Sequence, residues 1–189
     1  GAWTGLALRP MLPAHKARRL CRWRGVQIWD APHRPLFLAA SLWALIVVAW
    51  WPLGAAIGVP PPFEPAVLWH SHELLFGFAS AAIGGYLLTA LPGWTGLAPL
   101  HGGWLQGLVL LWGLARLATA FALSLPLPLL LLANAGYFLL LAAILLWHIL
   151  LARATSKLGF VAAVLGLGLC DALFLGAMVT GRPFTFAHT

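Results

Sequence analysis

The sequence has few charged residues. Asp, Glu, Lys and Arg make up only 8% of its 189 residues, against about 25% in an average soluble domain. Hydrophobic residues account for 62% of the chain, and eleven residues are tryptophan. This composition excludes an ordinary soluble domain. It predicts an all-α, polytopic bundle of transmembrane helices whose first partner is the lipid bilayer.

Cysteine and the signatures of common enzymes are also scarce. Cys21 lies in a basic segment and Cys170 inside a late apolar run, so we expect no disulfide between them. The chain contains no nucleophile, base and acid constellation, no phosphate loop and no dinucleotide fingerprint. These absences argue against a conventional hydrolase or kinase, and they leave open whether the protein is an enzyme.

The formal net charge of +7 comes mainly from one end of the chain. Seven of the eleven basic residues lie between Arg9 and Arg34, ahead of the first apolar run. Such a cluster reports membrane topology rather than a nucleic-acid partner, and we expect no nucleic acid to bind. We interpret residues 1–35 as a basic cytoplasmic segment that is disordered or foreign to the natural protein. The first apolar run begins too late for a secretory signal peptide.

Five apolar runs are long enough to cross a bilayer. They predict spans at about 36–57, 70–91, 104–123, 129–151 and 158–180, giving a bundle over 36–180 and a tail at 181–189. Arg153 and Lys157, between the last two spans, would lie on the same side as the N-terminal basic segment. Basic residues favour the cytoplasmic side, so we expect a multi-pass protein with a cytoplasmic N-terminus and an external C-terminus.

The second apolar run begins with a cluster of titratable residues. It reads WHSHELLFGFASAAIGGYLLTALPGWTG over residues 69–96, and we expect its helix to stop at Pro92 and Gly93. At 100° per residue, one stripe of this helix holds His70, Glu73, Gly77, Ala81 and Gly84. The opposite stripe holds His72, Phe76, Ala79, Ile83 and Tyr86. The small residues of the first stripe would admit a neighbouring helix or a flat ligand such as a porphyrin.

The same cluster supplies candidate metal ligands. Neutral imidazole binds haem iron and copper, and a nearby carboxylate commonly fixes its tautomer. His70 and His72 are therefore candidate ligands, with Glu73 as the supporting carboxylate. Because the two histidines project about 200° apart, an ideal helix cannot bring both to one metal. His72 is slightly favoured, the choice stays open, and ordinary helix packing with interfacial histidines is the alternative.

Two charged residues lie inside later spans. Arg116 and Asp171 are each about twelve or thirteen residues from the cytoplasmic start of their run, roughly 18 to 20 Å deep. Unpaired charges at that depth are costly. We expect an intramembrane charge pair, with Arg116 and Asp171 either in direct contact or each meeting another polar group such as a haem propionate. They also suggest an alternative function, a small-molecule or proton-coupled transporter.

Three stretches together resemble a known family. They are APHRPLFLAASLWAL at 31–45, WHSHELLFGFASAAIGGYLLTALPGWTGLAPL at 69–100 and LWGLARLA at 111–118. Over roughly residues 31–120 the chain is similar to the N-terminal part of the NnrS family. The family's HRP turn falls on His33, Arg34 and Pro35, and its N-W-T-G motif appears here as 93–96 with Gly93 in place of asparagine.

The resemblance implies a fold and a function. It implies a haem- and copper-containing protein of the bacterial inner membrane, with about twelve helices in the whole fold, of which this chain carries the N-terminal part. The missing C-terminal helices would be partners of this bundle. Such a protein contributes to resistance against nitric oxide and nitrosative stress by binding or processing nitric oxide or its metal adducts. The chain has no C-x-x-C-H motif, so we expect a b-type haem held without covalent attachment. A purely structural membrane subunit is a third hypothesis.

Overall fold

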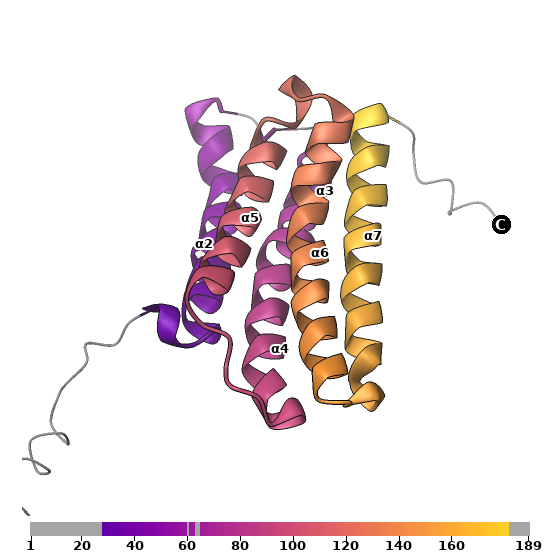
Figure 1. Cartoon of the computed structure of the whole chain (residues 1–189). Helices are drawn as coiled ribbons and strands as arrows, with labels where there is room; N and C mark the ends of the chain where they lie inside the picture. The colour runs from indigo at the N-terminus through magenta and orange to yellow at the C-terminus, as the bar shows by residue number, and fades with distance from the viewer. Residues whose placement is uncertain (1–27, 60, 63–64, 182–189) are drawn as a thin grey trace, which may run out of the picture.

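The computed structural model describes residues 28–59, 61–62 and 65–181 (Figure 1). Residues 1–27 of the basic segment and 182–189 of the tail lie outside the described residues. The helices are α2 (His33–Ile57), α3 (Ala66–His72), α4 (Ala79–Thr95), α5 (Gly103–Ala120), α6 (Leu127–Leu151) and α7 (Leu158–Thr180). Short 3₁₀ turns are η1 (Ile28–Asp30), η3 (Ala122–Ser124) and η4 (Thr155–Lys157). No strand occurs in these ranges, which confirms the predicted all-α class.

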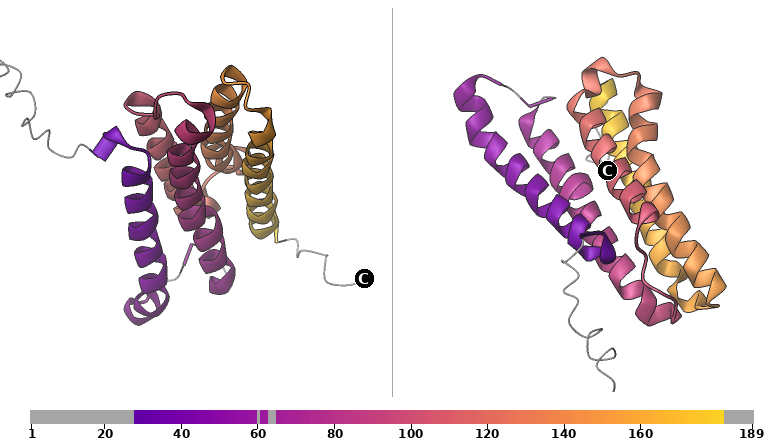
Figure 2. Two further views of the ribbon diagram at one scale, coloured as in Figure 1. Left: turned by 90° about the horizontal axis from the view of Figure 1, so that it is seen from below. Right: turned by 60° about the vertical axis from the view of Figure 1, so that its left-hand side comes forward.

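The helices form two layers. Figure 2 shows α2 beside the long helix that contains α3 and α4, with α5, α6 and α7 as the second layer. Within the second layer α6 packs between α5 and α7, and α4 contacts α6 across the layers. The helix that contains α3 and α4 runs antiparallel to α2, and α5, α6 and α7 alternate in direction after it (Figure 1). The arrangement brings the middle of each helix toward a common interior.

All five expected spans are helices, but one lacks the composition of a span. Four segments are long and apolar enough to cross a membrane: His33–Trp50, Ala66–Thr95, Leu127–Leu151 and Thr155–Thr180. The helix expected at 104–123 is α5, which is shorter than expected. Its 18 residues include Gln106, Arg116 and three glycines, which lower its hydropathy. Its buried face, from Leu105 through Leu108 and Trp112 to Thr119, follows the helical period and packs on α6.

The second span is longer than expected and changes its pitch. It runs without a break from Ala66 to Thr95, through a π-helical stretch, η2 (Glu73–Phe78), that joins α3 to α4. At the end of that stretch the N–H of Ala79 donates to the carbonyl of Leu74, five residues back. Helices with this wider turn are rare and are frequent at functional sites. The stretch begins at Glu73, within the predicted cluster.

The expected stop at Pro92 and Gly93 is wrong. The helix continues for a further turn, and Pro92 lies inside it. It ends at Gly96, whose positive φ of 69° lets its N–H donate to the carbonyl of Pro92. A glycine in this left-handed conformation is a common helix terminator. Pro92 lacks an N–H and so removes one backbone hydrogen bond, but the helix continues past it for only one turn.

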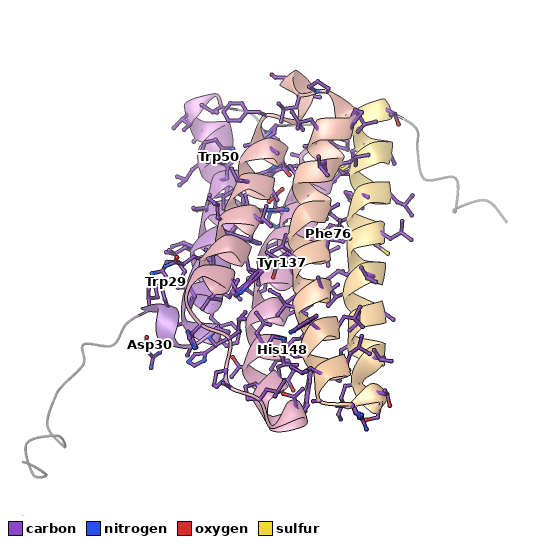
Figure 3. All side chains as sticks on the ribbon, viewed as in Figure 1. Trp29, Asp30, Trp50, Phe76, Tyr137 and His148 are labelled. Carbon is purple, nitrogen blue, oxygen red and sulfur yellow. The ribbon has the colours of Figure 1, made fainter. Side chains whose placement is uncertain are left out.

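The small-residue stripe is filled by side chains of neighbouring helices. A Cβ at Gly77 would lie 2.6 Å from the indole nitrogen of Trp43 on α2. A Cβ at Gly84 would collide with the hydroxyl of Tyr137 on α6, a side chain that Figure 3 labels near mid-height in the bundle. The stripe therefore admits neighbouring helices, the first of the two alternatives, and in the described chain aromatic side chains take the space that a flat ligand would need.

Candidate functional site: a buried ion network

His72 lies at the centre of a cluster of buried polar side chains. Its side chain is completely buried. Its Nε2 lies 2.7 Å from Oδ1 of Asp171 on α7, and its Nδ1 lies 3.0 Å from Oε1 of Glu73. The rings of Phe76 and Phe174 pack against the imidazole, with centroids 5.3 and 5.6 Å away. Both ring nitrogens are therefore within hydrogen-bond distance of a carboxylate.

Glu73 extends the cluster to three further helices. Its Oε2 accepts a hydrogen bond of 2.8 Å from Nη1 of Arg116 on α5 and one of 2.7 Å from the indole of Trp43 on α2. Nη2 of Arg116 donates to Oδ1 of Asn134 on α6 at 2.8 Å. The chain of contacts thus runs Asp171, His72, Glu73, Arg116, Asn134. We call these five residues the ion network.

Hydrogen bonds to backbone carbonyls hold the helices around the ion network. The indole of Trp112 on α5 donates to the carbonyl of Gly77 at 2.9 Å, and the hydroxyl of Tyr137 donates to the carbonyl of Ser80 at 2.8 Å. The hydroxyl of Ser80 donates to the carbonyl of Phe76 at 2.6 Å. These bonds hold the π-helical stretch against α5 and the first turn of α4 against α6, so contacts from the second layer lie directly after Glu73.

The charges of the ion network balance when both ring nitrogens of His72 are protonated and both carboxylates are ionised. Ionised carboxylates only accept hydrogen bonds, and a neutral imidazole carries a single N–H. His72 can therefore donate to both Glu73 and Asp171 only when both ring nitrogens are protonated. In that state His72 and Arg116 are positive and the two carboxylates negative, which gives a net charge of zero. Charge balance matters here because an uncompensated charge in an apolar interior is strongly destabilising.

The predicted site residues separate into two groups. His72 and Glu73 meet in the ion network, where the Nδ1 of His72 lies 3.0 Å from the carboxylate of its neighbour Glu73. His70 projects from another face of α3 and is half-buried. The two histidines thus have different surroundings, as their spacing predicted. The slight preference for His72 as a metal ligand finds no support in the geometry, since carboxylates occupy both of its ring nitrogens.

Arg116 and Asp171 both face the interior, as predicted from their depth. Their side chains are 3% and 0% exposed. Among the described residues, ion pairs join Arg116 to Glu73, Glu73 to His72 and His72 to Asp171, so Arg116 and Asp171 are linked through two residues instead of touching. Each meets another polar group, which is the second of the two expected arrangements. Direct pairing is not observed because His72 and Glu73 lie between them.

Sequence reasoning missed two members of this site. Asn134 was not singled out, although an amide inside the long apolar run LLLLANAGYFLLL is a detectable signal of an interior polar contact. Trp43 was not singled out either, and here no local signal exists. The first span contains several tryptophans, and only the packing of α2 against the π-helical stretch shows which indole reaches Glu73.

Comparisons with known proteins place this chain in a family. A family model described as NnrS protein matches residues 27–188. The match extends well beyond residue 120, where the resemblance read from motifs ended, and it includes α6 and α7 with Asn134 and Asp171. No curated protein and no solved structure matches the chain.

Proposed function

Because the chain belongs to the NnrS family, we propose that it contributes to resistance against nitric oxide and nitrosative stress in a bacterial inner membrane, with its N-terminus in the cytoplasm. The family match over nearly the whole helical bundle carries this proposal. The four helices that are long and apolar enough to cross a membrane and the buried ion network support it, because ionisable groups inside a membrane bundle are usually functional. The protein would act by binding or processing nitric oxide or its metal adducts.

Haem b and copper are the cofactors that the family implies, and the described residues fit them poorly at the predicted position. Hydrogen bonds occupy both nitrogens of His72 and both oxygens of Glu73. Among the described residues no group of three or more His, Cys, Asp or Glu is arranged to hold a metal. We therefore assign no step of a mechanism to either cofactor. The chain's own residues supply a rigid, charge-balanced interior.

The cofactor proposal is tested by measuring bound haem and copper in purified protein. His70→Ala and His72→Ala, singly and together, are compared with the natural sequence and with the control His101→Ala in an exposed loop. A loss confined to variants of His70 would support a ligand outside the ion network. Unchanged contents in all three variants would remove both predicted ligands from the proposal.

The nitric-oxide proposal is tested in living cells. A bacterium that lacks its own nitric-oxide defences expresses the chain and is exposed to a nitric-oxide donor, and the growth lag is measured. We expect a shorter lag than with an empty vector, and we expect Glu73→Gln to lengthen it again at equal protein levels. No protection by the natural sequence at confirmed membrane expression would contradict the proposal.

A proton-coupled transporter is the second candidate, and the ion network favours it. A histidine between two carboxylates, next to a guanidinium, is the kind of buried ionisable chain that transporters use to carry protons. In liposomes containing the purified protein and a trapped pH indicator, this candidate predicts proton flux without any cofactor. Asp171→Asn should abolish that flux, whereas a protein that acts only on nitric oxide would show none.

A further inference from the structure

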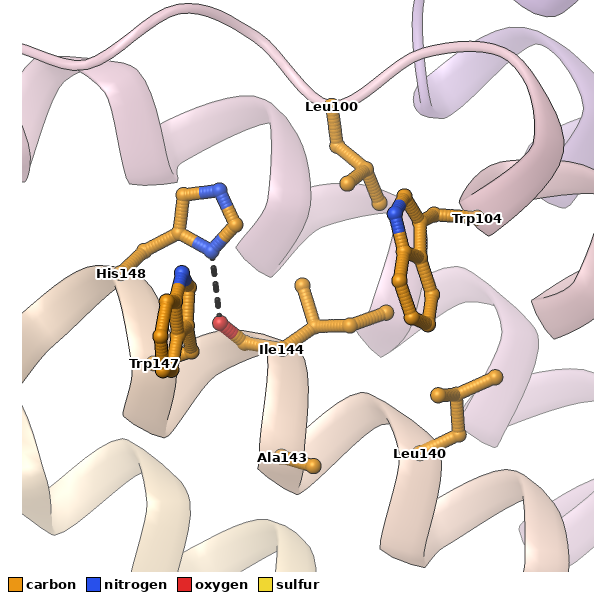
Figure 4. A pocket seen from close by; sticks show the side chains of 7 residues that line it. All are labelled: Leu100, Trp104, Leu140, Ala143, Ile144, Trp147 and His148. Atoms are coloured by element: carbon orange, nitrogen blue, oxygen red, sulfur yellow. Dashed lines mark hydrogen bonds between the residues drawn. The ribbon is translucent and has the colours of Figure 1, made fainter.

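A cavity lies outside the ion network, near the end of the bundle where α6 joins α7. It has a volume of about 590 Å³ and is lined chiefly by Leu100, Trp104, Leu140, Ile144, Trp147 and His148 (Figure 4). This size is within the range of small-molecule sites, about 300 to 1,000 Å³. Neither the sequence motifs nor the proposed function accounts for it.

His148 gives the cavity a fixed polar group. Its Nδ1 lies 2.8 Å from the carbonyl oxygen of Ile144, as the dashed line in Figure 4 shows. A carbonyl only accepts, so Nδ1 carries the proton and Nε2 of the neutral ring presents a lone pair. No hydrogen bond to Nε2 is found among the described residues. Nε2 of His148 is therefore a hydrogen-bond acceptor for a ligand in this cavity.

The lining residues indicate the charge and shape of a suitable ligand. Except for His148 the lining is aliphatic or indole, and it contains no Lys, Arg, Asp or Glu, so a charged ligand would lose its hydration without gaining a partner. The indoles of Trp104 and Trp147 favour a flat ring, because stacked aromatic pairs are more stable than their contact area alone predicts. These features indicate a neutral, flat ring with a hydroxyl donor.

The position of the cavity indicates how such a ligand arrives. Trp104 and Trp147 are 66% and 69% exposed on the outside of the described bundle, so the cavity is open on that side. His148 lies one turn before the end of α6, close to the level where bilayer meets water. A ring reaching His148 from the bilayer could leave an apolar tail in the lipid.

We propose that the cavity beside His148 binds the ring of a membrane-dissolved quinol, with one quinol hydroxyl donating to Nε2 and the ring against Trp104 or Trp147. A haem suits it less well. Haem carries two negative propionates and commonly takes two axial ligands, whereas the lining offers one imidazole and no cation.

The proposal is tested with purified full chain in detergent and a decyl-substituted benzoquinol, with binding measured by calorimetry. His148→Phe keeps a flat ring but removes the acceptor, and it should weaken binding about five- to tenfold, as loss of one hydrogen bond does. His148→Gln restores an acceptor near Nε2 and should recover most of the affinity. His101→Phe, in an exposed loop outside the cavity, is the matched control and should bind as the natural sequence does.

A second ligand isolates the hydrogen bond. The dimethyl ether of the same quinol has no donor, so it should bind natural protein as weakly as the quinol binds His148→Phe, and His148→Phe should not weaken its binding further. Equal affinity of the quinol and its ether would overturn the proposal, because the cavity would then hold any apolar molecule, including a lipid chain. A Soret band that forms with added haemin and disappears in His148→Phe would also overturn it, in favour of a porphyrin.

Discussion

Neighbouring residues on one helix turn have different roles in this protein. His70 and His72 differ by two positions, yet His72 lies in the ion network while His70 occupies another face of α3. Glu73 joins His72 because its carboxylate folds back onto the imidazole and at the same time reaches Arg116 and Trp43. Glu73 thus links His72 to Arg116 and connects the two layers of helices.

This role leads to a prediction for pairs of variants. Glu73→Gln or Arg116→Met alone leaves a buried charge without its partner, which destabilises proteins by about 3 to 5 kcal/mol. The double variant should lose clearly less than the sum of the two, because the two charges contact each other at 2.8 Å. The free energy of unfolding is measured in mixed micelles by titration with a denaturing detergent, followed by circular dichroism.

The comparison pair is Arg116→Met with Asp171→Asn. These residues connect only through His72 and Glu73, so their coupling energy should be smaller than that of Glu73 with Arg116. A larger coupling between Arg116 and Asp171 would contradict the contacts described and would support direct pairing of the two charges.

At the scale of the element, the π-helical stretch contains both Glu73 and the close contact of Gly77 with Trp43. It places Glu73 and Gly77 one turn apart on the side where Trp43 approaches, and the carboxylate oxygen of Glu73 lies 2.9 Å from the position of a Cβ at Gly77. Only a residue without a side chain leaves room there for both the carboxylate and the indole.

We therefore predict that Gly77→Ala destabilises the protein by about 1 to 3 kcal/mol, the range for overpacking a filled interior. The added methyl would displace Trp43 from Glu73, so the near-ultraviolet circular dichroism of tryptophan should change as well. Gly93→Ala is the control in the same continuous helix, because nothing lies within 4 Å of a Cβ there. Its unfolding free energy should be unchanged or slightly higher. Equal effects of both substitutions would show that the close approach at Gly77 is unimportant.

At the scale of the whole molecule, the antiparallel arrangement makes the orientation testable. The loop containing His101 and the turn containing Ser156 lie at one end of the bundle, and the turn containing Ser124 lies at the other (Figure 1). With the basic residues Arg153 and Lys157 on the cytoplasmic side, single cysteines at 101 and 156 should react only after the inner membrane is made permeable.

A cysteine at 124 should react from the outside of intact cells. The measurement uses a membrane-impermeant maleimide on variants whose native cysteines are replaced. Labelling of position 124 only in permeabilised cells would invert the orientation. Labelling of positions 101 and 124 from the same side would show that α5 does not cross, an informative result because α5 is the one expected span that lacks the composition of the others.

The sequence by itself determined the class and most of the helices. Long apolar runs form helices in a membrane because each backbone donor must find an acceptor within its own segment, so α7 was predicted at its observed bounds, 158–180, and α6 within two residues. The motif at 69–78 indicated the family, and it contains His72 and Glu73, two members of the ion network. The sequence also predicted that Arg116 and Asp171 face the interior, because an unpaired charge that faces lipid has a high free-energy cost.

Only the tertiary structure decided which polar groups meet. A period of 100° per residue places a side chain on a face, but the π-helical stretch Glu73–Phe78 departs from that period, and no local pattern in ELLFGF predicts the departure. The partners of Glu73 come from α2 and α5, 30 and 43 positions away in the chain. Their approach depends on how the two layers pack, which is why the sequence showed the charges but only the fold showed that His72 and Glu73 lie between Arg116 and Asp171.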